Sequence, residues 1–258
     1  LVHPDIHYSY PTVGTKVVST HLLPDWRKAM LGNPYLNANQ WLQSIGAENK
    51  QGNITKDECV EIIKKLSLKI FEGSHKILLM WLPEYLGKEG NRLLKMIEEP
   101  PPNTLFILVA ENQEMILNTI LSRCQLVKIN QLPDEDIVEA LVQHKNVPQE
   151  RATAAAHLAE GNYNEALNLL ENTENDNAIL FLEWMRLCYV GNGVSLMDWV
   201  DRFSKIGREN QKHFLKYGLH FMREYMLLKL TGSDNVKLLP NELKTAQNLT
   251  KVIEWNQV

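Results

Sequence analysis

The sequence predicts an α/β domain with a parallel sheet, followed by a region built from helices alone. Short apolar runs at residues 76–81 (KILLMW) and 104–110 (TLFILVA) are bounded by turn signals, which is typical of strands buried in a parallel sheet. A helical segment over residues 87–99 lies between them and is ended by three prolines at 100–102. After Pro133 no strand pattern recurs. This order indicates an α/β domain joined to all-α domains.

Two further elements are predicted before these strands. Residues 6–10 alternate between apolar and polar side chains, as an opening strand would. Thr55 and Glu58 form a capping box that begins a helix, and Gly73 is placed to end it. The apolar stripe expected on this helix consists of Val60, Ile63, Leu66, Ile70 and Phe71.

A short helix near 114–118 and a further strand at 126–129 (LVKI) complete the predicted α/β domain. Three short helices follow, at 134–143, 148–160 and 164–171. A polar linker over 171–177 separates them from a block with apolar residues at helical spacing between 179 and 226. The predicted domains are therefore 1–131 (α/β), 132–172 (three helices) and 173–258 (C-terminal helices).

Composition narrows the class of protein. The 258 residues are 44% hydrophobic and 22% charged, with a net charge of -4, so we expect a globular protein and no dedicated DNA-binding domain, which would carry a basic excess. Cys59, Cys124 and Cys188 suggest neither a disulfide framework nor a zinc pair and fit a reducing cytosol; we expect Cys59 and Cys188 to be buried. No apolar run approaches the ~20 residues of a membrane helix, and we expect a cytoplasmic protein without a membrane partner.

Three segments together resemble one family. They are NRLLKMIEEPP at 91–101, ILSRCQ at 120–125 and GNYNEAL at 161–167. In their order and spacing they resemble the clamp-loader branch of the AAA+ proteins, clearly over 54–170 and by helical character alone over 171–258. His3-Pro4-Asp5 is also similar to the family, where it follows a zinc-binding module; we expect N-terminal sequence to be missing here. Residues 15–53 have no counterpart in the resemblance.

The resemblance implies a partial AAA+ (RecA-like) domain, a three-helix lid and a helical collar that joins subunits. It also implies that the chemistry of ATP hydrolysis has been lost. Active members carry two acids after the strand that precedes the LLK helix, and these positions are Trp81 and Leu82 here. An arginine of the lid that faces the phosphates corresponds to Asn164. The phosphate loop G-x-x-x-x-G-K-[ST] is not found.

One catalytic group remains by resemblance. In this family the arginine of Ser-Arg-Cys, here Arg123, reaches across a subunit interface into the ATP site of the neighbour, and Ser122 and Cys124 are expected to fix the turn that aims it. A guanidinium suits this role because it is planar and permanently charged. No metal or cofactor is expected on this chain; ATP and magnesium would be bound by neighbouring subunits, and zinc only by a segment before Leu1.

The resemblance thus implies a clamp-loader subunit of the DNA polymerase holoenzyme, and the motif losses imply that it has no ATPase activity of its own. Its expected partners are the motor subunits and the clamp-opening subunit, and through them the sliding clamp and primed DNA. Two alternatives remain: an ATP-hydrolysing motor subunit or other AAA+ remodeller, and a pure scaffold with a vestigial AAA+ fold, in which Arg123 would be replaceable.

Overall fold

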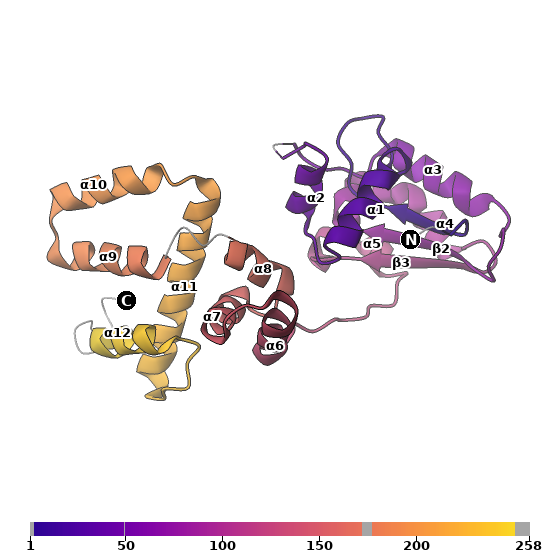
Figure 1. Ribbon diagram of the computed structural model, residues 1–258. Coiled ribbons are helices and arrows are strands. Elements are labelled where there is room, and N and C mark those ends of the chain that lie inside the picture. Colours follow the sequence, from indigo (N-terminus) through magenta and orange to yellow (C-terminus); the bar gives the residue numbers. More distant parts are fainter. Residues whose placement is uncertain (1–2, 49, 172–176, 251–258) are drawn as a thin grey trace. The chain divides into compact units, whose positions relative to one another are not determined.

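The computed structural model describes residues 3–48, 50–171 and 177–250, which fold as two compact units, Leu1–Ile129 and Asn130–Val258 (Figure 1). Each unit has hydrophobic cores of its own. The finer division into three domains stays a prediction. Its second boundary and most of the predicted linker, residues 172–176, lie outside the described residues.

The first unit is built on a parallel sheet. Its strands are β1 (Ile6–Ser9), β2 (Lys76–Trp81) and β3 (Thr104–Val109), in the order β1-β2-β3. Ile6 lies opposite Ile77, and Lys76 lies opposite Thr104. A parallel sheet connected by helices confirms the α/β prediction for this part of the chain.

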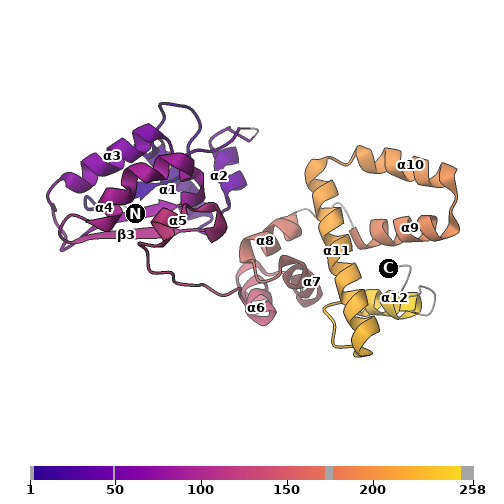
Figure 2. The ribbon, with the colours of Figure 1, turned by 180° about the vertical axis from the view of Figure 1, so that it is seen from behind.

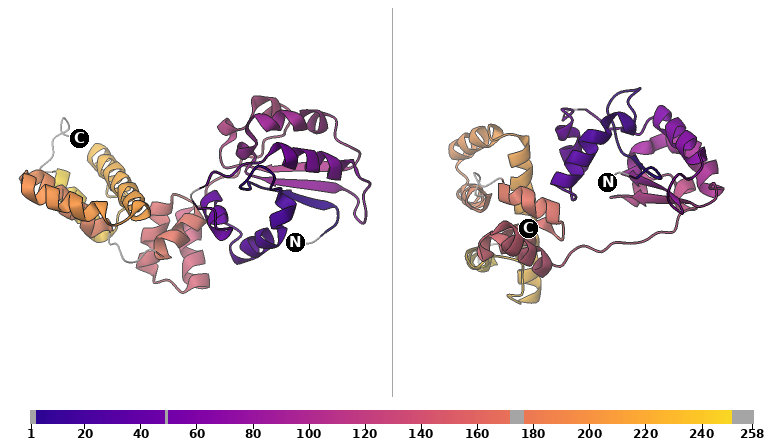
Figure 3. Two further views of the ribbon diagram at one scale, coloured as in Figure 1. Left: turned by 90° about the horizontal axis from the view of Figure 1, so that it is seen from above. Right: turned by 45° about the vertical axis from the view of Figure 1, so that its right-hand side comes forward.

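Helices cover the two faces of this sheet unequally (Figure 3). On one face lie α3 (Lys56–Ser67), η2 (Pro83–Leu93), α4 (Leu94–Glu98) and α5 (Asn118–Leu121). They pack on Leu78 and Met80 of β2 in a core completed by Ile54, Cys59, Ile62, Leu66, Leu86, Leu93, Ile116 and Ile120. The other face carries η1 (Ser19–Leu22), α1 (Leu23–Gly32) and α2 (Ala38–Ser44) around an aromatic cluster of Tyr10, Trp26 and Trp41. Residues 15–53 therefore close the second face of the sheet near β1.

The second face is open at β3, which lies at the edge of the sheet (Figure 2). Leu105, Ile107 and Val109 are exposed there, at 49%, 39% and 44%. The prediction that 104–110 is a buried strand was therefore wrong for one of its faces. The strand predicted at 126–129 was also wrong: this segment has no regular structure, and Ile129 is 85% exposed. A strand needs a neighbour to satisfy its backbone, and no described strand pairs with the outer edge of β3.

The end of α3 also differs from the prediction. The helix stops at Ser67 instead of Gly73. Lys76, buried at the start of β2, donates from Nζ to the carbonyl oxygens of Leu66 and Leu68. A cation that satisfies the last carbonyls of a helix stabilises its C-terminus. This contact is not visible in the local sequence pattern, and it accompanies a helix end six residues before Gly73.

The apolar stripe predicted for α3 was right in part. Leu66 is fully buried and Ile63 packs against the core, but Val60 and Phe71 are exposed, at 49% and 84%. Cys59 and Ile62 are buried in their place. The segment 87–99 differs as well, because it consists of the 3-10 segment η2 and the short helix α4 instead of one α-helix.

The second unit contains only helices among its described residues. They are α6 (Asp134–Lys145), α7 (Gln149–Ala159), α8 (Tyr163–Glu171), α9 (Asn177–Val190), α10 (Gly193–Ser204), α11 (Arg208–Thr231) and α12 (Pro240–Thr250). An alanine-rich core, with Ala152, Ala156 and Ala166 fully buried, holds α6–α8 together. An aromatic core around Phe181 and Phe221 joins α9–α12. Cys188 is exposed, so its predicted burial was wrong.

Ion pairs join α6–α8 to α11 and the segment after it. Lys216 lies 2.9 Å from Glu165, and Lys237 lies 2.7 Å from Asp134. Gly161, at the head of the GNYNEAL segment, has φ +84°, and a Cβ there would lie 2.6 Å from Gln131 Cβ. A glycine is required because this backbone conformation and the close approach both exclude a side chain.

Candidate functional site

The carboxyl end of β2 is where a parallel sheet presents ligand-binding groups, and here it is apolar. Trp81 is partly buried, and its ring centroid lies 5.0 Å from that of Trp26. Leu82 is 1% exposed and adopts φ 56°, ψ 60°. Indole and isobutyl groups neither coordinate magnesium nor polarise water. The residues at these two positions extend the cores and cannot take part in hydrolysis.

A carboxylate nearby is used to join the ends of two strands. Glu84 Oε1 accepts hydrogen bonds from the backbone N–H groups of Glu111 and Asn112, at 2.6 and 2.7 Å. Burial, and then the proximity of Glu84, raise the pKa of Glu111. This pair lies where β2 and β3 end, and Glu84 holds the segment that follows β3 against the segment that follows β2. These bonds join residues 27 and 28 positions apart and could not be found from spacing along the chain.

Arg123 sits in a tight turn after α5. Ser122 is the C-cap of the helix, and the backbone N–H groups of Arg123 and Cys124 donate to the carbonyls of Ile120 and Leu121, at 3.0 and 3.1 Å. The Cys124 side chain packs against the core, and this burial raises the pKa of its thiol. The turn is thus anchored on its cysteine side while the arginine points outward.

The guanidinium of Arg123 has three partners among the described residues. Nη1 donates to the carbonyl oxygen of Thr119, at 2.7 Å, and to Ser122 Oγ, at 3.2 Å. Nη2 lies 3.4 Å from Glu98 Oε2, at the end of α4. The side chain is 32% exposed. Ser122 therefore contacts both the turn and the guanidinium, and Glu98 is a partner that sequence reasoning missed.

A close helix contact sets the position of α5. A Cβ on Gly90 of η2 would lie 2.9 Å from Ile120 Cδ1 and 3.3 Å from Leu117 Cδ1. The side chains of Ile120 and Leu117 both belong to the core between the sheet and the helices α3, η2, α4 and α5. The glycine lets η2 approach α5 closely, and α5 leads directly into Arg123.

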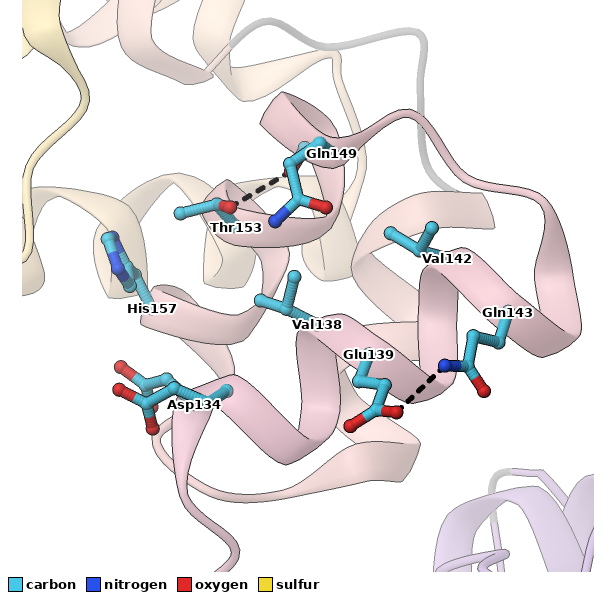
Figure 4. Close-up of a pocket in the computed structure, with 9 residues that line it drawn as sticks. Asp134, Val138, Glu139, Val142, Gln143, Gln149, Thr153 and His157 are labelled. Carbon is cyan, nitrogen blue, oxygen red and sulfur yellow. Dashed lines mark hydrogen bonds between the residues drawn. The ribbon is translucent and has the colours of Figure 1, made fainter.

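Asn164 lies in the second unit, in the first turn of α8, and is 4% exposed. A buried neutral amide cannot present a positive charge to a phosphate. The described part of this unit also has a groove of about 470 Å³ between α6 and α7 (Figure 4). Its lining combines Asp134, Glu135 and Glu139 with Val138 and Val142, so its charge is opposite to that of a nucleotide site.

Within the described residues, no cluster of three or more histidine, cysteine or acidic side chains is arranged to hold a metal ion. The same residues include no helix of the length and hydropathy needed to cross a bilayer. Asp5, from the His3-Pro4-Asp5 segment, has a structural role instead. Its carboxylate accepts hydrogen bonds from three backbone N–H groups, those of Phe71, Glu72 and Gly73, at 2.7–2.8 Å.

Comparison with known proteins supports one family. The sequence profile of a family described as "DNA polymerase III, delta subunit" matches residues 35–133, which include Trp81, Leu82 and Arg123. This match, with the relatives below, supports a clamp-loader family member. Over 131 residues it is 28% identical to DNA polymerase III subunit delta' of Escherichia coli (strain K12), spanning 50% of this chain and 39% of that protein. Subunit delta' of Bacillus subtilis (strain 168) is 34% identical over 85 residues, or 33% of this chain and 25% of that protein.

Clamp-loader relatives of another name match as well. DNA polymerase III subunit gamma of Buchnera aphidicola subsp. Schizaphis graminum is 28% identical over 224 residues, 76% of this chain and 61% of that protein. The chain thus spans less than two thirds of each of these relatives. A gamma subunit-related protein from Thermotoga maritima covers 78% of this chain and 73% of its own at 19% identity, with a TM-score of 0.35. Since that score is low, the fold assignment rests on the strands and helices described above.

Proposed function

We propose that this clamp-loader chain is a delta-prime-type subunit, which hydrolyses no ATP and lends Arg123 in trans to the ATP site of a neighbouring motor subunit. The observation that carries the proposal is a contrast within the first unit. The positions of the two catalytic acids hold an indole packed against Trp26 and a buried leucine, while Arg123 lies on a turn at the surface. ATP and magnesium would be bound by the neighbour.

The chemistry of phosphoryl transfer favours this role for Arg123. Charge builds up on the transferred phosphoryl oxygens, and an arginine supplied in trans stabilises it, with effects of ~10³–10⁵ on rate in GTPases. A guanidinium can fork onto two phosphate oxygens and stays charged at every physiological pH. Trp81 and Leu82 offer no such chemistry, so the contribution of this chain would be made entirely at a neighbour's site.

The second unit would assemble the complex. In this proposal α6–α8 form the lid and α9–α12 the collar. Large apolar side chains are exposed on α9, α10 and α11, among them Tyr189 at 77%, Val194 at 74% and Leu219 at 74%. Surfaces of this kind mark protein interfaces. The partners would be the motor and clamp-opening subunits, and the complex would load a sliding clamp onto primed DNA in the cytoplasm.

The motor-subunit alternative has one observation in its favour, the similarity to gamma subunits over three quarters of the chain. It requires an acid that holds magnesium, and the end of β2 supplies none. The scaffold alternative differs from our proposal in one prediction: a scaffold would tolerate replacement of Arg123, whereas our proposal requires this arginine for ATP hydrolysis by the complex.

The test is ATP hydrolysis by a reconstituted clamp loader that contains the full-length protein, stimulated by clamp and primed DNA. Arg123→Ala should leave assembly intact and lower stimulated turnover by about tenfold or more. Arg92→Ala is the matched control, because Arg92 is an exposed arginine of the same unit that pairs with Glu89 at 2.6 Å. The subunit alone should not hydrolyse ATP.

Either of two results would contradict the proposal. If Arg123→Ala assembles and hydrolyses ATP normally, the protein is a scaffold. If the isolated subunit hydrolyses ATP, the interpretation of Trp81 and Leu82 is wrong.

A further inference from the structure

The guanidinium of Arg123 is engaged by its own chain. An arginine has five N–H donors, and both hydrogens of Nη1 are directed at the Thr119 carbonyl and Ser122 Oγ. Nη2 faces the carboxylate of Glu98 at 3.4 Å. In this conformation the side chain cannot also present its Nη1–Nη2 fork to phosphate oxygens, because that edge is already occupied by oxygens of the same subunit.

Glu98 is held within reach of Arg123 by packing. It is the last residue of α4, whose Met96 and Ile97 pack against the core that also contains Ile120. A carboxylate at the C-terminus of a helix is not stabilised by the helix dipole, so α4 itself gives no reason for an acid there. The partner that does stabilise it is Arg123, reached from the end of α5.

We propose that Glu98 is a positioning residue that holds Arg123 on its own subunit until the phosphates of a neighbour's ATP compete for it. The inference rests on the proposed function of Arg123 and adds its regulation. A phosphate and the Glu98 carboxylate are both negative and cannot share the guanidinium at close range without repulsion. Engagement therefore exchanges one anion for the other, and the strength of the Glu98 contact sets how readily the arginine leaves.

The consequence for turnover has a definite sign. Glu98 stabilises only the held state, so its removal favours the engaged state. Hydrolysis by the loader without clamp and DNA should rise, whereas stimulated hydrolysis, in which the arginine is already engaged, should stay nearly constant. For a partly exposed ion pair the expected rise is about 1.5- to 5-fold, and the stimulation ratio should fall by the same factor.

The experiment compares Glu98→Gln with Glu99→Gln in the reconstituted loader with the full-length protein. The control makes the same change of charge at the next residue, whose carboxylate is not among the described partners of Arg123. KM for ATP and kcat are measured with and without clamp and DNA. Glu98→Gln should raise basal turnover and lower basal KM, Glu99→Gln should change neither, and Glu98→Gln should have no effect in an Arg123→Ala background.

Direct labelling tests the contact without reference to turnover. Phenylglyoxal modification of Arg123, followed by peptide mass spectrometry of the isolated full-length protein, should be faster in Glu98→Gln and unchanged in Glu99→Gln, with exposed Arg151 as the internal reference for reagent strength.

Each outcome is decisive. A fall in stimulated turnover in Glu98→Gln would mean that Glu98 aims the engaged arginine, and would overturn the holding role. Unchanged basal turnover and labelling would overturn it too. If Arg123→Ala itself leaves the loader unaffected, the proposed function has failed; if Arg123→Ala is deleterious and Glu98→Gln is silent, only the holding role has failed.

Discussion

The end of β2 and the turn after α5 lie in the same unit but differ in exposure: the side chains at the end of β2 are packed, whereas Arg123 in the turn is at the surface. At the end of β2, Trp81 packs against the aromatic core and Leu82 is only 1% exposed. At the turn, Cys124 is drawn into a core while Arg123 stays at the surface with polar partners. Under the proposed function, Arg123 must reach another subunit and therefore needs exposure, whereas Trp81 and Leu82 need not contact a ligand and can pack. Four predictions test this comparison.

The largest effect should come from restoring acids at the end of β2. Trp81→Asp combined with Leu82→Glu removes an aromatic contact and places a charge at a buried position. Together these changes should destabilise the first unit by about 3–5 kcal/mol, measured as the free energy of unfolding in urea. No ATP hydrolysis should appear.

Leu105→Glu is the matched control, because Leu105 is 49% exposed on the same sheet. It should cost less than about 1 kcal/mol. Equal costs for the control and for the double variant would show that the end of β2 is not part of a core.

The next effect concerns the position of the turn. Gly90→Ala introduces a methyl group 2.9 Å from Ile120 Cδ1 and should cost about 1–3 kcal/mol. Because α5 must shift to accommodate it, turnover of the loader should also fall. Gly32→Ala is the control, since Gly32 lies in the same unit, has no positive φ, and a Cβ there would meet no atom within 4 Å. If Gly90→Ala is stable and fully active, the close contact does not position Arg123.

A smaller effect is expected from Glu84, which connects the two regions. Glu84→Ala leaves the N–H groups of Glu111 and Asn112 without their acceptor, and should cost about 1–2 kcal/mol. Glu84→Gln keeps one carbonyl acceptor and should restore most of this loss. Hydrogen exchange of the two amides is the direct measurement; unchanged protection in Glu84→Ala would contradict the role.

The smallest effects appear as pH dependence and have opposite signs for two carboxyls. Hydrogen bonds from Gly73, Phe71 and Glu72 lower the pKa of Asp5 from 3.8 to about 2, so its contribution is present above about pH 4 and is lost as pH falls toward 2. The pKa of Glu111 is raised by burial and by Glu84, so stability falls as pH rises through it. In a plot of unfolding free energy against pH, Asp5→Asn should flatten the loss of stability between about pH 4 and 2. Glu111→Gln should remove the loss of stability that accompanies ionisation of Glu111, and unchanged plots would refute the assignments.

Local sequence predicted what depends on local pattern. The strands at 76–81 and 104–109 and the start of α3 at Thr55 were visible as apolar runs and a cap, and Thr55 Oγ1 does accept from Glu58 N, at 3.3 Å. The Glu58 carboxylate was expected to return to the cap, but it bonds Ser19 at 2.6 and 2.7 Å, 39 residues away. Distant partners of this kind cannot be found from spacing along the chain.

Some features of the candidate site could likewise be predicted from the sequence, and others could not. The absence of acids at Trp81 and Leu82 is a statement about residue types and needs no structure. The contact of Arg123 with Glu98 joins two helices through a shared core, and the strand expected at 126–129 depended on a neighbour that the described sheet does not include. Neither the contact nor the absence of this strand could be predicted without the fold, because each depends on which elements lie side by side.

The exposed side of β3 has a practical consequence. Its outer edge carries backbone groups that no described strand satisfies, next to Leu105, Ile107 and Val109. Such an edge is a ready template for the addition of a strand from another molecule. We therefore expect the isolated chain to self-associate through this edge as its concentration rises. Ile107→Lys should reduce that self-association, because a charged side chain disfavours the addition of a strand.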